Sequence, residues 1–149
     1  MRILRINFLI ILLIGLLFSC QTFTGNQKEK AKQEIEQTER DFLKMSIDKG
    51  IAVAFSFFAD TDAVVKSDDS LIKGKTAVSR FYGSPFFTNA SFIWSPDFVD
   101  ASDDGKLGYS YGKYIFQSRD SAGKENEFKG IFHTVWKKQA DGSWKYVWD

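Results

Sequence analysis

Three evenly spaced turn signals in the second half of the sequence constrain the fold more than any other feature of this chain. They are Asp103-Asp104-Gly105, Ser121-Ala122-Gly123 and Asp141-Gly142. Long segments rich in aromatic and β-branched residues separate these signals, a composition typical of strands. The pattern predicts an antiparallel meander of four strands joined by hairpins, with strands of about ten to fourteen residues.

Glycines inside the expected strands indicate the shape of this sheet. Gly108, Gly112 and Gly130 all lie within segments that otherwise favour strand. A glycine inside a strand usually marks a bulge or a bend, because it has no side chain to pack. We therefore expect a strongly curved sheet.

The segment over 28–49 predicts one long helix. A single apolar stripe runs along it with spacings of four and three, as expected for a helix that packs one face on a core. The members of the stripe are Ala31, Ile35, Thr38, Phe42 and Met45. Gly50 follows as the residue that ends the helix.

Shorter elements follow the long helix. The sequence predicts a second helix over 51–59 and a third over 75–82, and two short strands at 63–66 and 71–73 around a turn. Helices first and a bent meander second indicate the α+β class. We expect three N-terminal helices to pack on one face of a curved antiparallel sheet made of the two short strands and the four-stranded meander.

The first nineteen residues resemble a bacterial export signal. Arg2 and Arg5 precede an apolar run over 8–18, which is too short to cross a bilayer core of about 30 Å but fits a signal peptide. Leu17-Phe18-Ser19-Cys20 resembles the lipobox of bacterial lipoproteins. This resemblance implies cleavage before Cys20 and acylation of Cys20, and two or more acyl chains give stable membrane anchoring.

The lipobox resemblance divides the chain into three parts. Residues 1–19 form the signal peptide, 20–27 the acylated cysteine with a polar, flexible tether, and 28–149 one domain. Gln21 after the cysteine implies the outer membrane of a bacterial envelope, by the enterobacterial sorting pattern. An ordinary secretory signal and an uncleaved N-terminal anchor remain the alternatives.

The composition excludes several classes of function. Hydrophobic residues make up 44% and aromatic residues 16% of the 149 residues, too many for a disordered chain. The net charge of +1 becomes −1 without Arg2 and Arg5, so no basic surface for nucleic acid is expected. One Cys, in the leader region, and one His leave few ligands for zinc. We expect no nucleic-acid partner, no metal and no cofactor.

Four motifs together resemble a known superfamily. They are Phe57-Phe58-Ala59-Asp60-Thr61-Asp62-Ala63, Gly74-Lys75-Thr76-Ala77-Val78, Leu107-Gly108-Tyr109-Ser110-Tyr111-Gly112, and Gly130 with the closing segment over 135–145. In order and spacing the chain over 28–149 resembles the nuclear transport factor 2-like superfamily, which includes ketosteroid isomerase and the SnoaL polyketide cyclases. The motifs look like a branch whose members mostly lack an assigned function. The resemblance implies a cone-shaped fold with a cavity under its helices.

The residues that catalyse the isomerase reaction are changed in this chain. The resemblance carries the family's oxyanion-binding Tyr to Phe42, its proton-moving Asp to Ser67 with Asp68 next to it, and its late-strand Asp to Thr134. Phe42 cannot donate a hydrogen bond, so a developing oxyanion loses that support. This argues against isomerase chemistry.

Two further acid–base candidates are Asp68 and His133. Strand alternation places His133 on the outward face of the sheet, with Ile131 and Val135 as neighbours. A histidine there is exposed or lies in a dimer contact. Asp68 is one residue from the position carried over from the family, so it stays a candidate base.

Aromatic side chains give the positive indication of a site. We expect the cavity to be lined from a set of inward-facing residues, namely Phe42, Phe55, Phe58, Trp94, Tyr109, Tyr111, Phe132, Thr134 and Trp136. The leading interpretation is a non-catalytic envelope lipoprotein that binds a small apolar molecule or a partner segment. The alternatives are an enzyme of proton transfer or hydration, using Asp68 or a pocket Tyr, and a structural module that dimerises through the convex sheet face.

Overall fold

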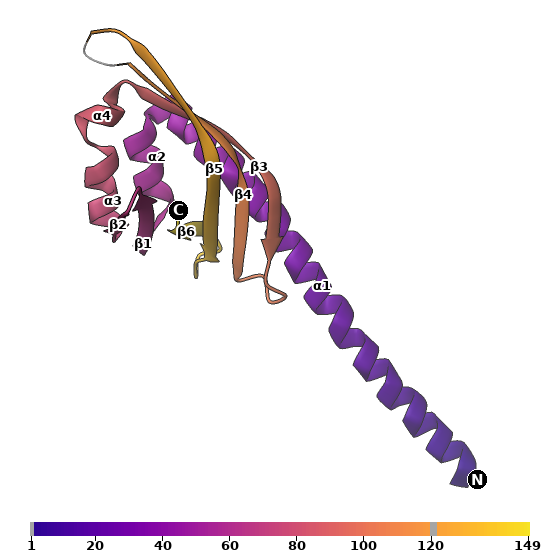
Figure 1. Ribbon diagram of the computed structural model, residues 1–149. Helices are drawn as coiled ribbons and strands as arrows, with labels where there is room; N and C mark the ends of the chain where they lie inside the picture. Colours follow the sequence, from indigo (N-terminus) through magenta and orange to yellow (C-terminus); the bar gives the residue numbers. More distant parts are fainter. Residues whose placement is uncertain (1, 120–121) are drawn as a thin grey trace.

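The computed structural model describes residues 2–119 and 122–149, with side chains described from Asn26 onward. The elements follow in the order α1 (Arg2–Lys49), α2 (Ile51–Phe58), β1 (Ala59–Ser67), β2 (Ser70–Lys73), α3 (Lys75–Tyr82), α4 (Pro85–Thr88), β3 (Ala90–Ala101), β4 (Leu107–Arg119), β5 (Glu125–Lys138) and β6 (Trp144–Trp148). This is the α+β arrangement that the sequence predicts, and Figure 1 shows its helices on one side of a bent sheet.

Helix α1 is longer than the helix predicted over 28–49. It begins at Arg2, so the segment 20–27 is helical where the sequence predicts a flexible tether. This segment contains no proline, and a single glycine costs a helix only about 1 kcal/mol. Figure 1 shows the first half of α1 projecting away from the sheet. The side chain of the predicted lipidation residue Cys20 lies outside the described residues, so the anchor and the division at 20 and 28 stay predictions. Within the described part of the chain, no helix is long and apolar enough to cross a membrane.

The six strands form one open sheet in the order β2-β1-β6-β5-β4-β3. The predicted meander is present, because β3, β4, β5 and β6 pair antiparallel in sequence order. The new feature is a parallel pairing between β1 and β6, which joins the short hairpin to the meander. Strand β6 has five residues and is shorter than predicted, and α4 was not predicted.

Two of the predicted strand glycines are required by close approach. A Cβ atom on Gly108 would lie 2.3 Å from the Cδ1 atom of Ile35, because α1 packs directly on β4 there. A Cβ atom on Gly112 would lie 2.1 Å from the carbonyl oxygen of Ser95, beside the register shift between Pro96 and Phe98. The sheet bends at this bulge, which confirms the prediction of curvature.

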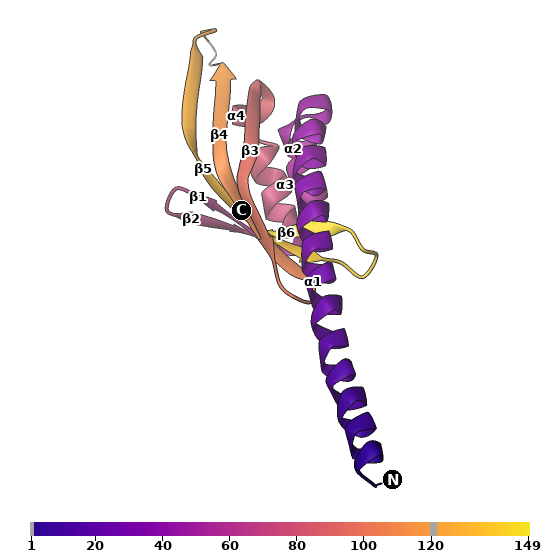
Figure 2. The same cartoon turned by 90° about the vertical axis from the view of Figure 1, so that its right-hand side faces the viewer.

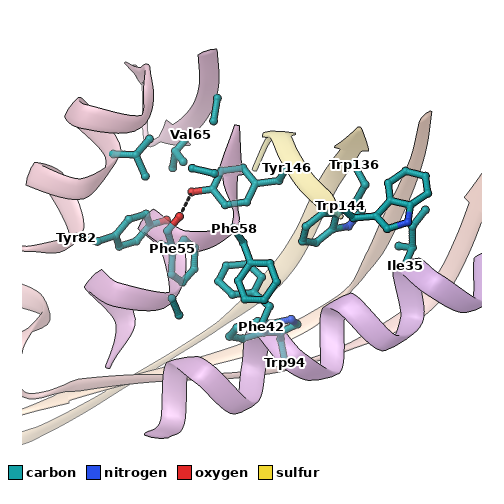
Figure 3. Packing of buried hydrophobic residues seen from close by; sticks show 14 of the residues in the cluster. Ile35, Phe42, Phe55, Phe58, Val65, Tyr82, Trp94, Trp136, Trp144 and Tyr146 are labelled. Atoms are coloured by element: carbon teal, nitrogen blue, oxygen red, sulfur yellow. Dashed lines mark hydrogen bonds between the residues drawn. The ribbon is translucent and has the colours of Figure 1, made fainter. Parts of the chain in front are cut away.

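The core lies between the helices and the concave face of the sheet, as Figure 2 shows for α1, α2 and α3. Phe42 of α1 occupies its centre, with its ring centroid 4.7 Å from Phe55, 4.8 Å from Phe58 and 4.9 Å from Trp94. Figure 3 shows these rings together with Trp136 and Tyr146. Each buried aromatic side chain removes roughly 150–250 Å² from water, so this cluster supplies much of the stability.

Candidate functional site

A cavity of about 430 Å³ lies between the helices and the concave face of the sheet. Its aromatic walls come from every layer of the domain and consist of Phe42, Phe55, Tyr82, Phe92, Trp94, Tyr114, Phe132 and Trp148. Its polar or charged residues are Glu39, Lys66, Asp68, His133, Thr134 and Asp149. A larger hollow of about 700 Å³ lies at the outer ends of β3, β4 and β5, but polar, mostly exposed residues line it. The aromatic cavity is therefore the better candidate site.

Local packing sets the shape of the aromatic walls. The rings of Phe55 and Tyr82 lie 4.0 Å apart between centroids, and those of Phe92 and Tyr114 lie 5.8 Å apart. The Tyr114 ring lies over Gly130, where an added Cβ atom would be 2.6 Å from its nearest ring carbon. Glycine at this position of β5 thus makes room for a wall of the cavity.

Asp149 supplies a carboxyl group to the cavity. Its backbone N–H donates to the Val64 carbonyl at 2.9 Å, and its carbonyl accepts from the Lys66 N–H at 2.8 Å. Thr134 Oγ1 donates to Asp149 Oδ1 at 2.6 Å. Burial raises the pKa of the Asp149 carboxyl to about 6, the Thr134 hydroxyl lowers it, and the nearby Glu39 carboxylate raises it. The Asp149 carboxyl therefore changes between its neutral and its ionised form near pH 6.

Glu39 of α1 is a second carboxyl group, and it is only 2% exposed. Its oxygens accept hydrogen bonds from Trp94 Nε1 at 2.8 Å, from Trp136 Nε1 at 3.1 Å and from the Ser110 hydroxyl. Burial raises the pKa of Glu39, and these three donors lower it. Because the donors lie on β3, β4 and β5, Glu39 links α1 by hydrogen bonds to three strands of the sheet.

Two tyrosine hydroxyls near the cavity differ in their partners. The Tyr146 hydroxyl donates to the Phe55 carbonyl oxygen at 2.8 Å, the bond drawn in Figure 3. The Tyr82 hydroxyl has no hydrogen-bond partner among the side chains described over 26–119 and 122–149, although the residue is only 6% exposed. Burial and the nearby Asp149 carboxylate raise the pKa of Tyr82 well above its ordinary value, so it is a neutral donor. It is available to a ligand.

The structure separates the predicted cavity residues into three groups: those that line the cavity, those in the packed core beside it, and those on the outward face of the sheet. Phe42, Phe55, Trp94, Phe132 and Thr134 line the cavity. Phe58 and Trp136 lie in the packed core beside it.

The prediction for Tyr109 and Tyr111 is wrong, since both lie on the outward face and are 37% and 41% exposed. The reason is the alternation of β4, which turns Gly108, Ser110 and Gly112 toward α1 and the concave side. The close approach of Ile35 to Gly108 leaves no space for an aromatic ring on that side.

Asp68 and His133 lie at the rim of the cavity. Asp68 is exposed, in the turn between β1 and β2, with a φ of 49°. His133 is exposed on the outward face, with its ring centroid 6.0 Å from that of Tyr109. Neither side chain hydrogen-bonds to Asp149 or Thr134 within the described chain.

The sequence analysis missed three residues of the site, Glu39, Tyr82 and Asp149. Glu39 had a signal, because it lies four residues after Ile35 and three before Phe42, inside the apolar stripe of α1. Asp149 is brought next to Thr134 by the β5–β6 hairpin, whose register sets Val135 opposite Trp148. The parallel pairing of β1 with β6, which has no local signal, holds the Asp149 backbone against Val64 and Lys66. Among the described residues, no group of three or more His, Cys, Asp or Glu side chains could hold a metal ion.

Solved structures share this architecture, although neither a family model nor a curated protein sequence matches the chain. A nuclear transport factor 2-like superfamily protein from Salmonella enterica subsp. enterica serovar Typhimurium str. LT2 gives a TM-score of 0.68 at 19% identity, over 80% of this chain and 88% of that one. A ketosteroid isomerase-like protein from Erwinia carotovora atroseptica gives 0.66 at 16% identity, over 78% and 91%. The association domain of C. elegans CaMKII gives 0.60 at 16% identity, over 80% and 93%. The predicted cone fold is thereby confirmed.

Proposed function

We propose that this chain, which has the nuclear transport factor 2-like fold, binds a small, largely apolar molecule in the cavity under its helices. The observation that carries the proposal is the cavity itself, about 430 Å³ in volume with aromatic walls and a few convergent polar groups. Small-molecule sites have this size and this composition. The Tyr82 hydroxyl and the Asp149 carboxyl are the groups that orient a ligand.

The binding role is favoured over isomerase chemistry by the residues at the carried-over positions. Phe42 presents a ring and no donor, and Thr134 uses its hydroxyl on Asp149. The Trp94 and Trp136 N–H groups are both held by Glu39. Preorganised donors for a developing oxyanion are therefore committed to other partners.

A ligand screen tests the binding role. We expect the full chain in a non-ionic detergent to be stabilised against heat by at least one class among steroids, polyketides and fatty acids or their amine analogues. Phe92→Ala removes a cavity wall and should weaken the binding at least about tenfold. Phe98→Ala, on the outward face of the same strand, is the matched control and should bind normally. Absence of stabilisation by every class contradicts the proposal.

A proton-transfer enzyme is the second candidate, favoured by the pKa of about 6 at Asp149 inside the cavity. The measurement is exchange of the α-hydrogens of a cyclic ketone with solvent deuterium, followed by NMR. Exchange that disappears in Asp149→Asn would establish this candidate. Exchange equal to that of buffer would remove it.

Self-association through the outward face is also proposed. Phe98 and Tyr111 stack there with centroids 5.3 Å apart, and Ile131 on β5 is 77% exposed. An exposed apolar patch of this kind favours a protein partner. We expect a dimer by analytical ultracentrifugation at micromolar concentration, and a monomer for Ile131→Lys. A monomeric parent chain contradicts this proposal.

The lipid anchor at Cys20 is the remaining proposal, with the bacterial outer membrane as its location. It rests on the lipobox-like sequence before Cys20. Cys20→Ala should release the protein from the membrane fraction, whereas Thr24→Ala should not. Membrane association of Cys20→Ala equal to that of the parent would contradict the anchor.

A further inference from the structure

We infer that the ligand of the cavity is an organic cation, an ammonium group carried on an apolar ring or chain, with the Asp149 carboxylate as its counter-ion. The inference rests on the proposed binding function and names its ligand class. It follows from two features of the cavity, the half-buried Asp149 carboxyl group, which forms no salt bridge with the described residues, and the aromatic rings around it.

Asp149 lacks the positive partner that other acids of this chain have. Asp100 forms a salt bridge with Lys28 at 3.0 Å, and Glu34 forms one with Lys138 at 2.6 Å. In the described part of the chain, Asp149 forms no salt bridge and has one side-chain hydrogen bond, from Thr134. A carboxylate removed from water without a counter-ion is costly, and burial together with the nearby Glu39 carboxyl raises the pKa of Asp149.

The groups that face Asp149 do not neutralise it. Glu39 from α1 adds a second carboxyl group, and Tyr82 from α3 and Tyr146 from β6 are neutral phenols. The charged or titratable groups at the rim are Lys66 of β1, Asp68 of the β1–β2 turn and His133 of β5. The phenol of Tyr114, from β4, lies inside the cavity. The Lys66 ammonium donates to the Asp68 carbonyl at 2.7 Å and is exposed. The interior thus has an excess of negative charge.

The aromatic walls favour the same ligand class. Rings of Phe55, Tyr82, Phe92, Trp94, Tyr114, Phe132 and Trp148 surround the cavity. A cation near aromatic faces gains about 2 kcal/mol when it is desolvated. A carboxylate ligand gains nothing from the rings and is repelled by Asp149 and Glu39. An ammonium ion alone benefits from both features.

The test compares two probes of one shape. Benzyltrimethylammonium carries the positive charge, and neopentylbenzene is its neutral isostere. With the full chain in a non-ionic detergent at pH 7.5, equilibrium dialysis should give at least about tenfold tighter binding of the cation. Asp149→Asn, whose amide still accepts from Thr134, should abolish this preference. Asp69→Asn, an exposed acid in the β1–β2 turn, is the matched control and should keep it.

The pH dependence gives a second readout. A cation binds the ionised form of Asp149, so its affinity should fall about tenfold as the pH drops from 7 to 5 through the pKa of about 6. The neutral isostere should not show this fall, and neither should the Asp149→Asn variant with the cation.

Each contrary result has its own meaning. Neopentylbenzene binding as tightly as the cation overturns the inference and leaves the binding function in place. A preference that survives in Asp149→Asn also overturns it, because the counter-ion is then another group. Failure of both probes overturns the inference too, and the wider ligand screen then decides the proposed function separately.

Discussion

Two carboxyl groups that line the cavity, the buried Glu39 and the half-buried Asp149, are held in different ways. Glu39 has three donors from three strands, and packed aromatic rings surround it. Asp149 has one side-chain donor, Thr134, and faces a cavity of about 430 Å³. The difference teaches that a buried carboxyl group with three donors links the elements of the fold, whereas a half-buried one with a single donor is left available to a ligand.

Removal of the Glu39 carboxyl should give the largest effect. Glu39→Ala leaves the Trp94 N–H and the Ser110 hydroxyl without an acceptor, and leaves the Trp136 N–H with Ser110 Oγ alone, so we expect a loss of about 3 to 5 kcal/mol in unfolding free energy. Urea unfolding followed by tryptophan fluorescence measures this loss. Glu36→Ala, on the exposed side of the same helix, should stay within about 0.5 kcal/mol. A loss below about 1 kcal/mol at Glu39 would show that it does not fasten α1.

Removal of the Asp149 charge should instead increase the unfolding free energy. Its folded-state pKa of about 6 lies above the ordinary value of 3.8, so the folded chain binds more protons than the unfolded chain between these values. Stability therefore falls as the pH rises from about 4 to 6, by about 2 kcal/mol. Asp149→Asn should be more stable than the parent by about that amount at pH 7.5 and equal to it at pH 4. The comparison of the two carboxyl groups fails if the variant is destabilised at pH 7.5.

Two glycines compare the packed part of the core, where α1 contacts β4, with the part beside the cavity. Gly108→Ala places a Cβ atom 2.3 Å from the Ile35 Cδ1 atom and 2.8 Å from the Asp100 carbonyl oxygen, and the backbone carbonyl cannot withdraw. We expect a loss of about 2 to 3 kcal/mol. Gly130→Ala meets only the Tyr114 ring, which borders the cavity and can turn into it, so the loss should stay below about 1 kcal/mol. Thermal unfolding of both variants decides, and equal losses would mean that the cavity offers no room.

Much of the fold could be predicted from local signals, whereas the site depends on contacts between distant segments. The turn signals gave the meander, and the helix predicted over 75–82 has the bounds of α3. The pairing of β1 with β6 has no local signal, and it holds the Asp149 backbone against Val64 and Lys66. Tyr109 and Tyr111 lie on the outward face because they alternate along β4 with the buried Gly108 and Ser110, a pattern that the sequence contains. Glu39 was visible in the sequence, as a charge inside an apolar stripe.

The smallest change in unfolding free energy is expected at the two buried tyrosines. It tests whether the hydroxyl beside the cavity, like the Asp149 carboxyl, contributes little to the stability of the fold. Tyr146→Phe removes the hydrogen bond to the Phe55 carbonyl, which keeps only the backbone N–H of Ala59 as a donor, so it should lose about 1 kcal/mol. Tyr82→Phe removes a hydroxyl that has no partner in the described chain, so its unfolding free energy should stay within about 0.5 kcal/mol of the parent. If Tyr82→Phe instead loses as much as Tyr146→Phe, the Tyr82 hydroxyl supports the fold and is not held in reserve for a ligand. If Tyr82→Phe leaves stability unchanged yet weakens ligand binding, the Tyr82 hydroxyl forms its hydrogen bond only with a ligand bound in the cavity.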